Sequence, residues 1–432
     1  MRHDGDELGG TTRASGREVF AGVAAGPVAV VMFVASCIAV DGGLGRGSLR
    51  GDVGYYASIA ERVRGGAIPY HDFYLEYPPG ALPVFVFPEA LPGLSYTTWF
   101  NLLMTACGAG SILCARLVLR RLGAGLSRTM FALGTMSVSP LLLGSIMINR
   151  YDLVLALLLT ATLALLLSDR VGWSSATLAI AFVAKLLPLL LIPVIAVRVA
   201  RSSGRRALVR ALLIFAGLSA AVFVPFASIA FGGVGFSIWS QTRRDLHIES
   251  FGASVLLAAD KMGFYEAQWV WGAPAQIDLA GALPDAVGVL STLVQLCALA
   301  AVVIAFARGA ADAERLVAAF VAGVTALLVL GKVLSPQFLV WLVPLVPLLC
   351  GRIGRTAIVL LAGALIVTQV ESAHDRDVGS GLRGGDWTVW ALLGRNMLLV
   401  GIFVLAFLQL RQLTPVGRGS AQPLDPADKD LR

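Results

Sequence analysis

The sequence predicts an all-α polytopic membrane protein, and three observations support this fold class. Of the 432 residues, 57% are hydrophobic and only 14% are charged, whereas a typical soluble protein carries about 25% charged residues. Apolar runs of about 20 residues, long enough to cross the roughly 30 Å of a hydrocarbon core, recur along the chain. Basic residues gather in every second loop between these runs. A chain so poor in charge cannot cover a water-facing surface, which excludes a soluble enzyme.

About twelve membrane-spanning segments are predicted, within a range of ten to thirteen. Several are shorter than an ideal span. Around Lys185 and Pro188 the pattern fits either two short helices that meet at a membrane face or one broken hairpin. The predicted segments cover residues 20–40, 96–120, 129–148, 150–168, 172–185, 187–199, 208–231, 284–307, 313–331, 335–350, 354–370 and 387–410.

The placement of the positive charges predicts the orientation of these segments, because cytoplasmic loops are enriched in Lys and Arg. With the N-terminal tail 1–19 in the cytoplasm, every second loop should be basic, and it is. The C-terminal tail 411–432 is then also cytoplasmic, and its three prolines and lack of an apolar run predict disorder. The net charge of +7 therefore indicates orientation and not a nucleic-acid partner. The basic loops contain Arg116, Arg120, Arg121, Arg128, Arg170, Arg198, Arg201, Arg205, Arg206, Arg210, Arg308, Arg315, Arg352, Arg355, Arg411 and Arg418.

The opposite, outer face is expected to carry the chemistry. It holds three longer polar stretches, 41–95, 232–283 and 371–386, which contain most of the His, Asp and Glu of the chain. Loops of this length exceed what topology requires. In the first of these stretches, Asp41, Asp52, Asp72 and Glu76 form no Asp-x-Asp pair or clustered triad, and the five cysteines of the chain lack metal-ligand spacing. We therefore expect neither a metal nor a cofactor.

The first outer loop is the most informative stretch. It runs from Gly51-Asp52-Val53-Gly54 to Tyr77-Pro78-Pro79, and its residues 55–64 have the spacing of a short amphipathic helix. Asp52 would lie at or just before the start of that helix. By spacing alone it fits an N-cap, which accepts backbone N–H bonds, as well as it fits a catalytic carboxylate.

Several motifs along the chain together resemble glycosyltransferase family 87. This family is a branch of the GT-C superfamily of polytopic enzymes that use polyprenyl-phosphate sugars, and it includes actinobacterial mannosyltransferases. The high content of Ala, Gly, Arg and Val fits such a source. The motifs follow in order over residues 20–370: Asp52, then Gly66-x-x-Pro-Tyr-x-Asp-Phe73 and Tyr77-Pro78-Pro79, Asn149-Arg150-Tyr151-Asp152, Ala184-Lys185-Leu186-Leu187-Pro188, the stretch Arg243 to Ser250, and the stretch Lys332 to Phe338.

The resemblance implies a GT-C-type helix bundle over residues 20–410 in the plasma membrane, with its active site on the outer face. It implies inverting transfer of a hexose, with mannose the first candidate, from a polyprenyl-phosphate donor to a lipid-linked or cell-envelope glycan acceptor. The family's first-loop Asp is a general base, and Asp52 is the matching position. An alcohol is a weak nucleophile that a positioned carboxylate activates, while a departing phosphate needs cations more than an acid.

The candidate donor-phosphate contacts are Arg150, Lys185, Arg243, Arg244, His247 and Lys332. The two lysines interrupt apolar runs, where a charge is costly and usually functional, although a lysine at a span end can also simply snorkel to the interface. Arg150 and Asp152 are close enough in sequence to form a plain salt bridge instead. The candidate acceptor or sugar contacts are Tyr55, His71, Asp72, Glu76, Glu249 and Gln337. For the charge run 243–249, a solvated loop face is the simpler alternative.

A transporter or flippase of lipid-linked sugars is the competing hypothesis. It could use the same intramembrane cations to hold a phosphate. A carrier should line a path through the middle of the membrane, whereas a transferase needs its polar groups on one face, as in this sequence. The chain also lacks the internal repeat of matched halves that many carriers show.

Overall fold

The computed structural model describes residues 16–44, 51–272, 276–378 and 386–413. The tails 1–15 and 414–432 and residues 379–385 of the predicted outer loop 371–386 lie outside the described residues. The described helices are α1 (Gly16–Asp41), α2 (Gly51–Arg64), α3 (Leu82–Glu89), α4 (Tyr96–Arg121), α5 (Leu126–Leu143), α6 (Asp152–Leu167), α7 (Val171–Ala184), α8 (Ile192–Thr242), α9 (Phe251–Lys261), α10 (Ala282–Arg308), α11 (Ala313–Val329), α12 (Leu339–Leu342), α13 (Gly351–Val378) and α14 (Asp386–Gln412).

The predicted apolar segments all fall on helical parts of the chain. Seven of the described helical segments are long and apolar enough to cross a membrane, and shorter apolar helices cover 152–167, 171–184 and 336–348. A bend at Gly204, whose φ of 81° suits glycine, divides α8 into two helices. Around Lys185 the chain forms two helices, because α7 ends at Ala184, Lys185 is extended, and a 3₁₀ turn follows over Leu187–Leu191. The fold class predicted from the sequence is confirmed.

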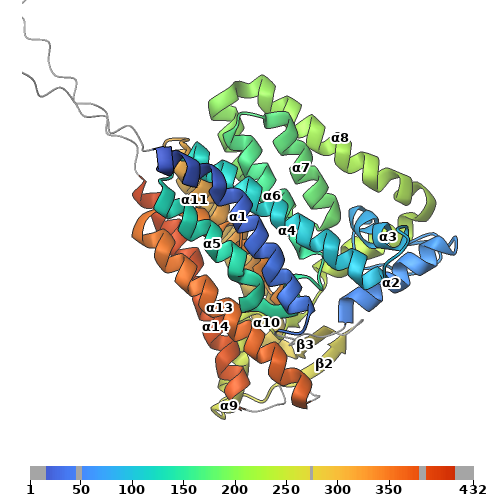
Figure 1. Cartoon of the computed structure of the whole chain (residues 1–432). Coiled ribbons are helices and arrows are strands. Elements are labelled where there is room, and N and C mark those ends of the chain that lie inside the picture. Colours follow the sequence, from blue (N-terminus) through green and yellow to red (C-terminus); the bar gives the residue numbers. More distant parts are fainter. Residues whose placement is uncertain (1–15, 45–50, 273–275, 379–385, 414–432) are drawn as a thin grey trace, which may run out of the picture.

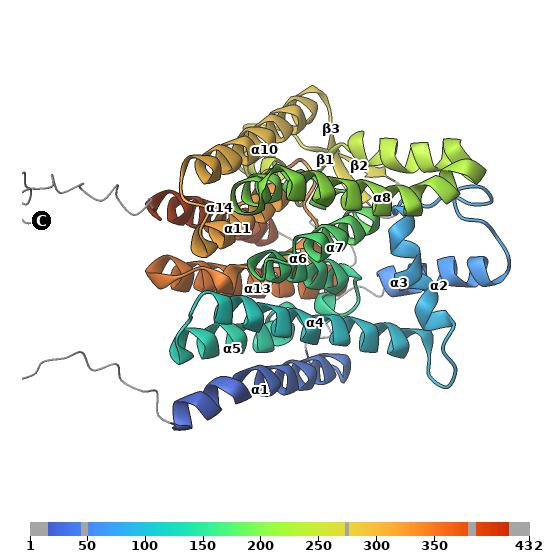
Figure 2. The ribbon, with the colours of Figure 1, turned by 90° about the horizontal axis from the view of Figure 1, so that it is seen from above.

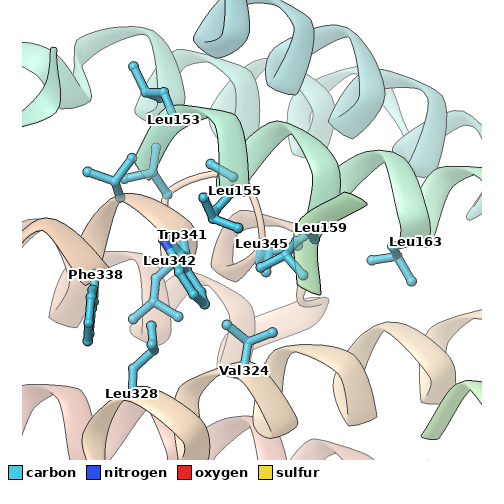
Figure 3. Close-up of a cluster of buried hydrophobic side chains, with 14 of the residues drawn as sticks. Leu153, Leu155, Leu159, Leu163, Val324, Leu328, Phe338, Trp341, Leu342 and Leu345 are labelled. Carbon is cyan, nitrogen blue, oxygen red and sulfur yellow. The ribbon is translucent and has the colours of Figure 1, made fainter. Parts of the chain in front are cut away.

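The centre of the bundle is built on α6, α11 and α12. Every residue of α11 from Arg315 to Val329 is buried, as expected for a helix that is apolar on all sides. In Figure 3, Leu155 and Leu159 of α6 and Val324 of α11 lie around Trp341 of α12. The outer helices are different: α10 exposes apolar side chains such as Leu290 and Leu293. Such an exposed apolar surface suits contact with lipid.

The two ends of the bundle differ. At one end lie the start of α1 and the end of α14, and at the other lie α2, α3 and a small sheet (Figures 1 and 2). The sheet was not predicted. It has the order β1-β3-β2, with β1 (Leu246–His247) and β2 (Gln268–Gly272) both antiparallel to β3 (Gln276–Ala280). Its strands are too short to give a clear two-residue repeat in the sequence, and they pair only after the second outer loop folds.

Candidate active site

Asp52 lies in the first turn of α2, which begins four residues before the predicted helix. Its Oδ1 lies 2.6 Å from Nη1 of Arg150, and its Oδ2 accepts a hydrogen bond of 3.3 Å from the Tyr56 hydroxyl. Burial raises the pKa of the Asp52 carboxyl, and the Arg150 charge and the Tyr56 hydrogen bond oppose that shift. The Asp52 side chain keeps 27% of its surface exposed, so it is held in place by its partners and still accessible from outside the protein.

Arg150 reaches Asp52 from the turn that precedes α6. Its side chain is 11% exposed. The alternative salt bridge to Asp152 does not form, because Asp152 is the first residue of α6 and is buried in the core, where it binds Lys185 instead. The two charged residues of this motif therefore have separate partners, and Arg150 connects α6 to the first outer loop.

Lys185 is enclosed and does not snorkel. Its Nζ lies 2.7 Å from Oδ1 of Asp152, and the same oxygen accepts a 2.7 Å hydrogen bond from Nε1 of Trp341. The ammonium lies 5.0, 4.3 and 5.2 Å from the ring centres of Tyr151, Phe338 and Trp341, which are cation–π distances. Sequence reasoning missed the two residues from the 336–348 segment. The sequence did contain one indication of such partners, because a carboxylate inside an apolar run, as at Asp152, usually has a buried partner.

Glu76 and Arg244 form a second ion pair beside Asp52. Glu76 Oε2 lies 3.4 Å from Nη2 of Arg244, and the Glu76 carbonyl accepts hydrogen bonds from Ser237 and Gln241 of α8. Burial raises the pKa of the Glu76 carboxyl and the Arg244 charge lowers it. The charges of Asp52 and Lys185 also act on the Glu76 pKa, so these groups share one electrostatic neighbourhood.

Aromatic side chains form the floor of this region. Tyr56 stacks on Phe85 with ring centres 4.3 Å apart, and it meets Tyr151 edge to face at 5.9 Å. Tyr55 lies 6.3 Å from Tyr77, and burial raises the pKa of its hydroxyl to about 12, with the Glu76 charge adding to the shift. The predicted acceptor contact Tyr55 is therefore a neutral hydroxyl at the edge of the Asp52 site.

His71 and Asp72 are placed apart from this cluster. They bind each other at 2.7 Å, and their side chains are 56% and 43% exposed. Asp72 also accepts a 2.7 Å hydrogen bond from the backbone N–H of Ile68, and these bonds lower the pKa of its carboxyl. Their position gives the Pro-Tyr-x-Asp-Phe motif a local role in closing a turn, next to Tyr70 with its φ of 69°.

The remaining predicted cations, Arg243 and Lys332, lie at the C-terminal end of α8 and are called the rim cations below. The Arg243 guanidinium stacks over the Trp239 ring at 4.9 Å. Lys332 donates from Nζ to the carbonyl of Thr242 at 3.1 Å, and its own carbonyl accepts the backbone N–H of His247 at 3.0 Å. Gln337 accepts a hydrogen bond of 2.6 Å from the Ser335 hydroxyl. In these contacts, neither Arg243 nor Lys332 is paired with a carboxylate.

Glu249 is anchored to the bundle by a buried arginine that sequence reasoning missed. Arg395 of α14 donates to the Glu249 carboxylate and to its carbonyl, each at 2.8 Å, and Asn396 donates to that carbonyl at 3.1 Å. Both α14 side chains are fully buried. His247 lies near this group with its surface partly buried, and desolvation lowers the pKa of its imidazole. An arginine inside the apolar run 387–410 was the available signal.

No metal-binding cluster of three or more His, Cys, Asp or Glu side chains occurs among the described residues. The expectation that the chain needs neither a metal nor a cofactor stays a prediction.

The fold and the site define a multi-pass membrane protein that gathers carboxylates, cations and tyrosines at one end of a helix bundle. The chain belongs to glycosyltransferase family 87, whose family model matches residues 74–331, more than half of the sequence. The family predicted from the motifs is thereby confirmed, whereas the GT-C type of the membrane bundle stays a prediction. The matched region is shorter than the predicted 20–370: Asp52 precedes it, and Lys332 and Gln337 follow it.

Among solved structures, the chain is similar to the crystal structure of ArnT from Cupriavidus metallidurans bound to undecaprenyl phosphate. The TM-score is 0.49 at 17% sequence identity, over 92% of this chain and 78% of that one. No curated protein matches the chain.

Proposed function

We propose that this membrane glycosyltransferase transfers a hexose, with mannose the first candidate, from a polyprenyl phosphate to a lipid-linked or cell-envelope glycan acceptor. The reaction inverts the anomeric centre, and Asp52 is the general base. The site faces the outside of the plasma membrane, because the arginine-rich loops that mark the cytoplasmic side lie at the other end of the bundle.

The contact between Asp52 and Arg150 carries this proposal. It places a partly exposed carboxylate and a guanidinium 2.6 Å apart, and the two halves of the reaction need these two groups. The carboxylate can take the proton of the acceptor hydroxyl, and the guanidinium can bind phosphate oxygens in a bidentate manner. While Arg150 holds Asp52, the carboxylate is a weaker base. A donor phosphate that draws Arg150 away would free the carboxylate when the sugar is in place.

In the proposed step, the acceptor oxygen attacks the anomeric carbon from the face opposite the phosphate. The new carbon–oxygen bond forms as the bond to the phosphate oxygen breaks, and the electron pair of that bond leaves with the phosphate. The hydroxyl proton passes to Asp52. The leaving phosphate gains negative charge, which Arg150 and the rim cations Arg243 and Lys332 would stabilise.

The other site residues serve binding and position in this proposal. Glu76 and Tyr55, beside Asp52, would bind hydroxyls of the acceptor or sugar, and Arg244 would orient Glu76 through their ion pair. Lys185 would add only a small positive potential from its aromatic enclosure, because its charge is balanced by Asp152. His247, Glu249 and Gln337 border the site from the second half of the chain, and the exposed His71 and Asp72 would meet the acceptor further out.

The donor class is tested by sugar transfer in membranes that contain the protein. Labelled polyprenyl-phosphate mannose, polyprenyl-phosphate glucose and a nucleotide-linked mannose are offered separately with a native lipid extract. We expect transfer from a lipid-linked sugar and none from the nucleotide sugar in washed membranes. Transfer from the nucleotide sugar alone would contradict the proposed donor, and sugar movement across vesicles without transfer would instead support a flippase.

A further inference from the structure

A groove of about 540 Å³ opens at the end of the bundle opposite Asp52. It lies where α10 and α14 end and α11 begins, and Figure 2 shows these helices side by side at that end. Its wall is mostly apolar, and two arginines stand at its edge. The lining side chains that the argument uses are Ala301, Ile304, Ala305, Phe407, Arg308 and Arg411.

Arg315 forms the floor of the groove and has a structural role. Its guanidinium donates four hydrogen bonds of 2.6 to 2.9 Å to backbone carbonyls at the ends of α10 and α14, those of Ala305, Ala310, Leu410 and Leu413. A helix leaves its last carbonyls without partners inside the helix, so Arg315 joins the two helix ends and fixes the width of the groove. Four of its five N–H groups are therefore directed to the protein.

Arg308 and Arg411 differ from Arg315. Each lies in the last turn of its helix and is exposed to solvent. Within the part of the chain that the structure describes, neither side chain has a hydrogen-bond or ion-pair partner. The nearby carboxylates are engaged: Asp312 accepts the backbone N–H of Arg315, and Glu314 binds Arg128. Two positive charges therefore face the same groove, and no described carboxylate forms an ion pair with either of them.

We propose that this groove binds the headgroup of an anionic phospholipid. Its charge is complementary to a phosphate, its volume lies in the range of small-molecule sites, and Ile304 and Phe407 offer apolar contact to the first carbons of the acyl chains. Above the groove, α10 exposes apolar side chains, including Leu293 and Leu296, along which the chains can lie. Two arginines at the level of the headgroups can bind one phosphate from both sides. A lipid bound there would bridge α10 and α14.

The test uses the full-length chain in nanodiscs or detergent and counts bound lipids by native mass spectrometry. Phosphatidylglycerol and phosphatidylcholine are titrated against the wild type and against the double variant Arg308→Gln/Arg411→Gln. We expect the first phosphatidylglycerol to bind the wild type about tenfold more tightly than phosphatidylcholine, and the double variant to lose that preference. Equal binding of the two lipids to the wild type would overturn the proposal.

A matched control separates a built site from general attraction to a negative membrane. Arg352→Gln/Arg355→Gln removes the same charge from exposed positions at the start of α13, outside the groove. We expect this variant to keep the preference for phosphatidylglycerol. If both double variants lost that preference equally, general surface charge would explain the binding and the proposed site would be overturned. Ile304→Trp fills the groove without changing charge and should also remove the preference. Competition by soluble glycerol phosphate as strong as that by the lipid would overturn the lipid assignment.

Discussion

Replacing Asp52 by Asn is the sharpest test of the proposed chemistry, because the change removes a charge and preserves the shape. The Asn carbonyl can still accept the Tyr56 hydrogen bond, but it cannot take a proton from the acceptor. Arg150 loses its ion-pair partner.

The structure separates the catalytic effect of this change from its effect on stability. A positioned general base contributes about 10²- to 10⁴-fold in rate, or about 3 to 5 kcal/mol of activation free energy. Breaking a fully buried ion pair costs about 3–5 kcal/mol of folding free energy, but Asp52 is 27% exposed and solvent screening reduces this to about 1–2 kcal/mol. That loss leaves a protein of ordinary stability folded, so the expected fall in kcat reports chemistry.

The assay follows labelled mannose from polyprenyl phosphate into the acceptor in membranes with matched amounts of each protein. Because the variant frees Arg150 for the phosphate, KM for the donor should stay equal or fall while kcat drops at least a hundredfold. Glu61→Gln is the control, since Glu61 is an exposed carboxylate on the same helix. Transfer by Asp52→Asn within threefold of the wild type would remove Asp52 from the mechanism.

Three other predictions follow from the buried and partly buried charges. Arg150→Gln removes the cation that lowers the Asp52 pKa, so that pKa should rise and the acidic limb of the pH–rate profile should move to higher pH; an unmoved limb would refute the coupling. Asp152→Asn leaves the Lys185 ammonium buried without its carboxylate, so the free energy of unfolding in detergent should fall by about 3 kcal/mol. The control is Asp169→Asn at an exposed position, which should change that free energy little. Equal falls in the two variants would contradict the reasoning. Arg395→Lys cannot make both bonds to Glu249, so amide hydrogen exchange in residues 246–261 should speed up by about tenfold or more while that of α11 does not change.

The sequence was sufficient for the spans because apolar length is a local property of the chain. Each predicted segment falls on a helical part of the chain. The break near Lys185 is consistent with Pro188, which has no backbone N–H to donate to the carbonyl of Ala184, where α7 ends. The family could also be predicted from the sequence, because its motifs follow one another in order along the chain. The short sheet of the second outer loop was missed because its stability comes from pairing between strands, not from the residues of any one strand.

The partners of the charged side chains could be found only in the tertiary structure. By sequence, Arg150 had Asp152 as its nearest carboxylate, yet it binds Asp52 from a different outer segment. Lys185 was recognisable as a costly intramembrane charge, but its enclosure by Phe338 and Trp341 depends on how the 336–348 segment packs against α6. Hydrophobic length specifies which segments enter the membrane, whereas helix packing decides which charges meet, because a buried charge must find its partner among whatever side chains the neighbouring helices bring to it.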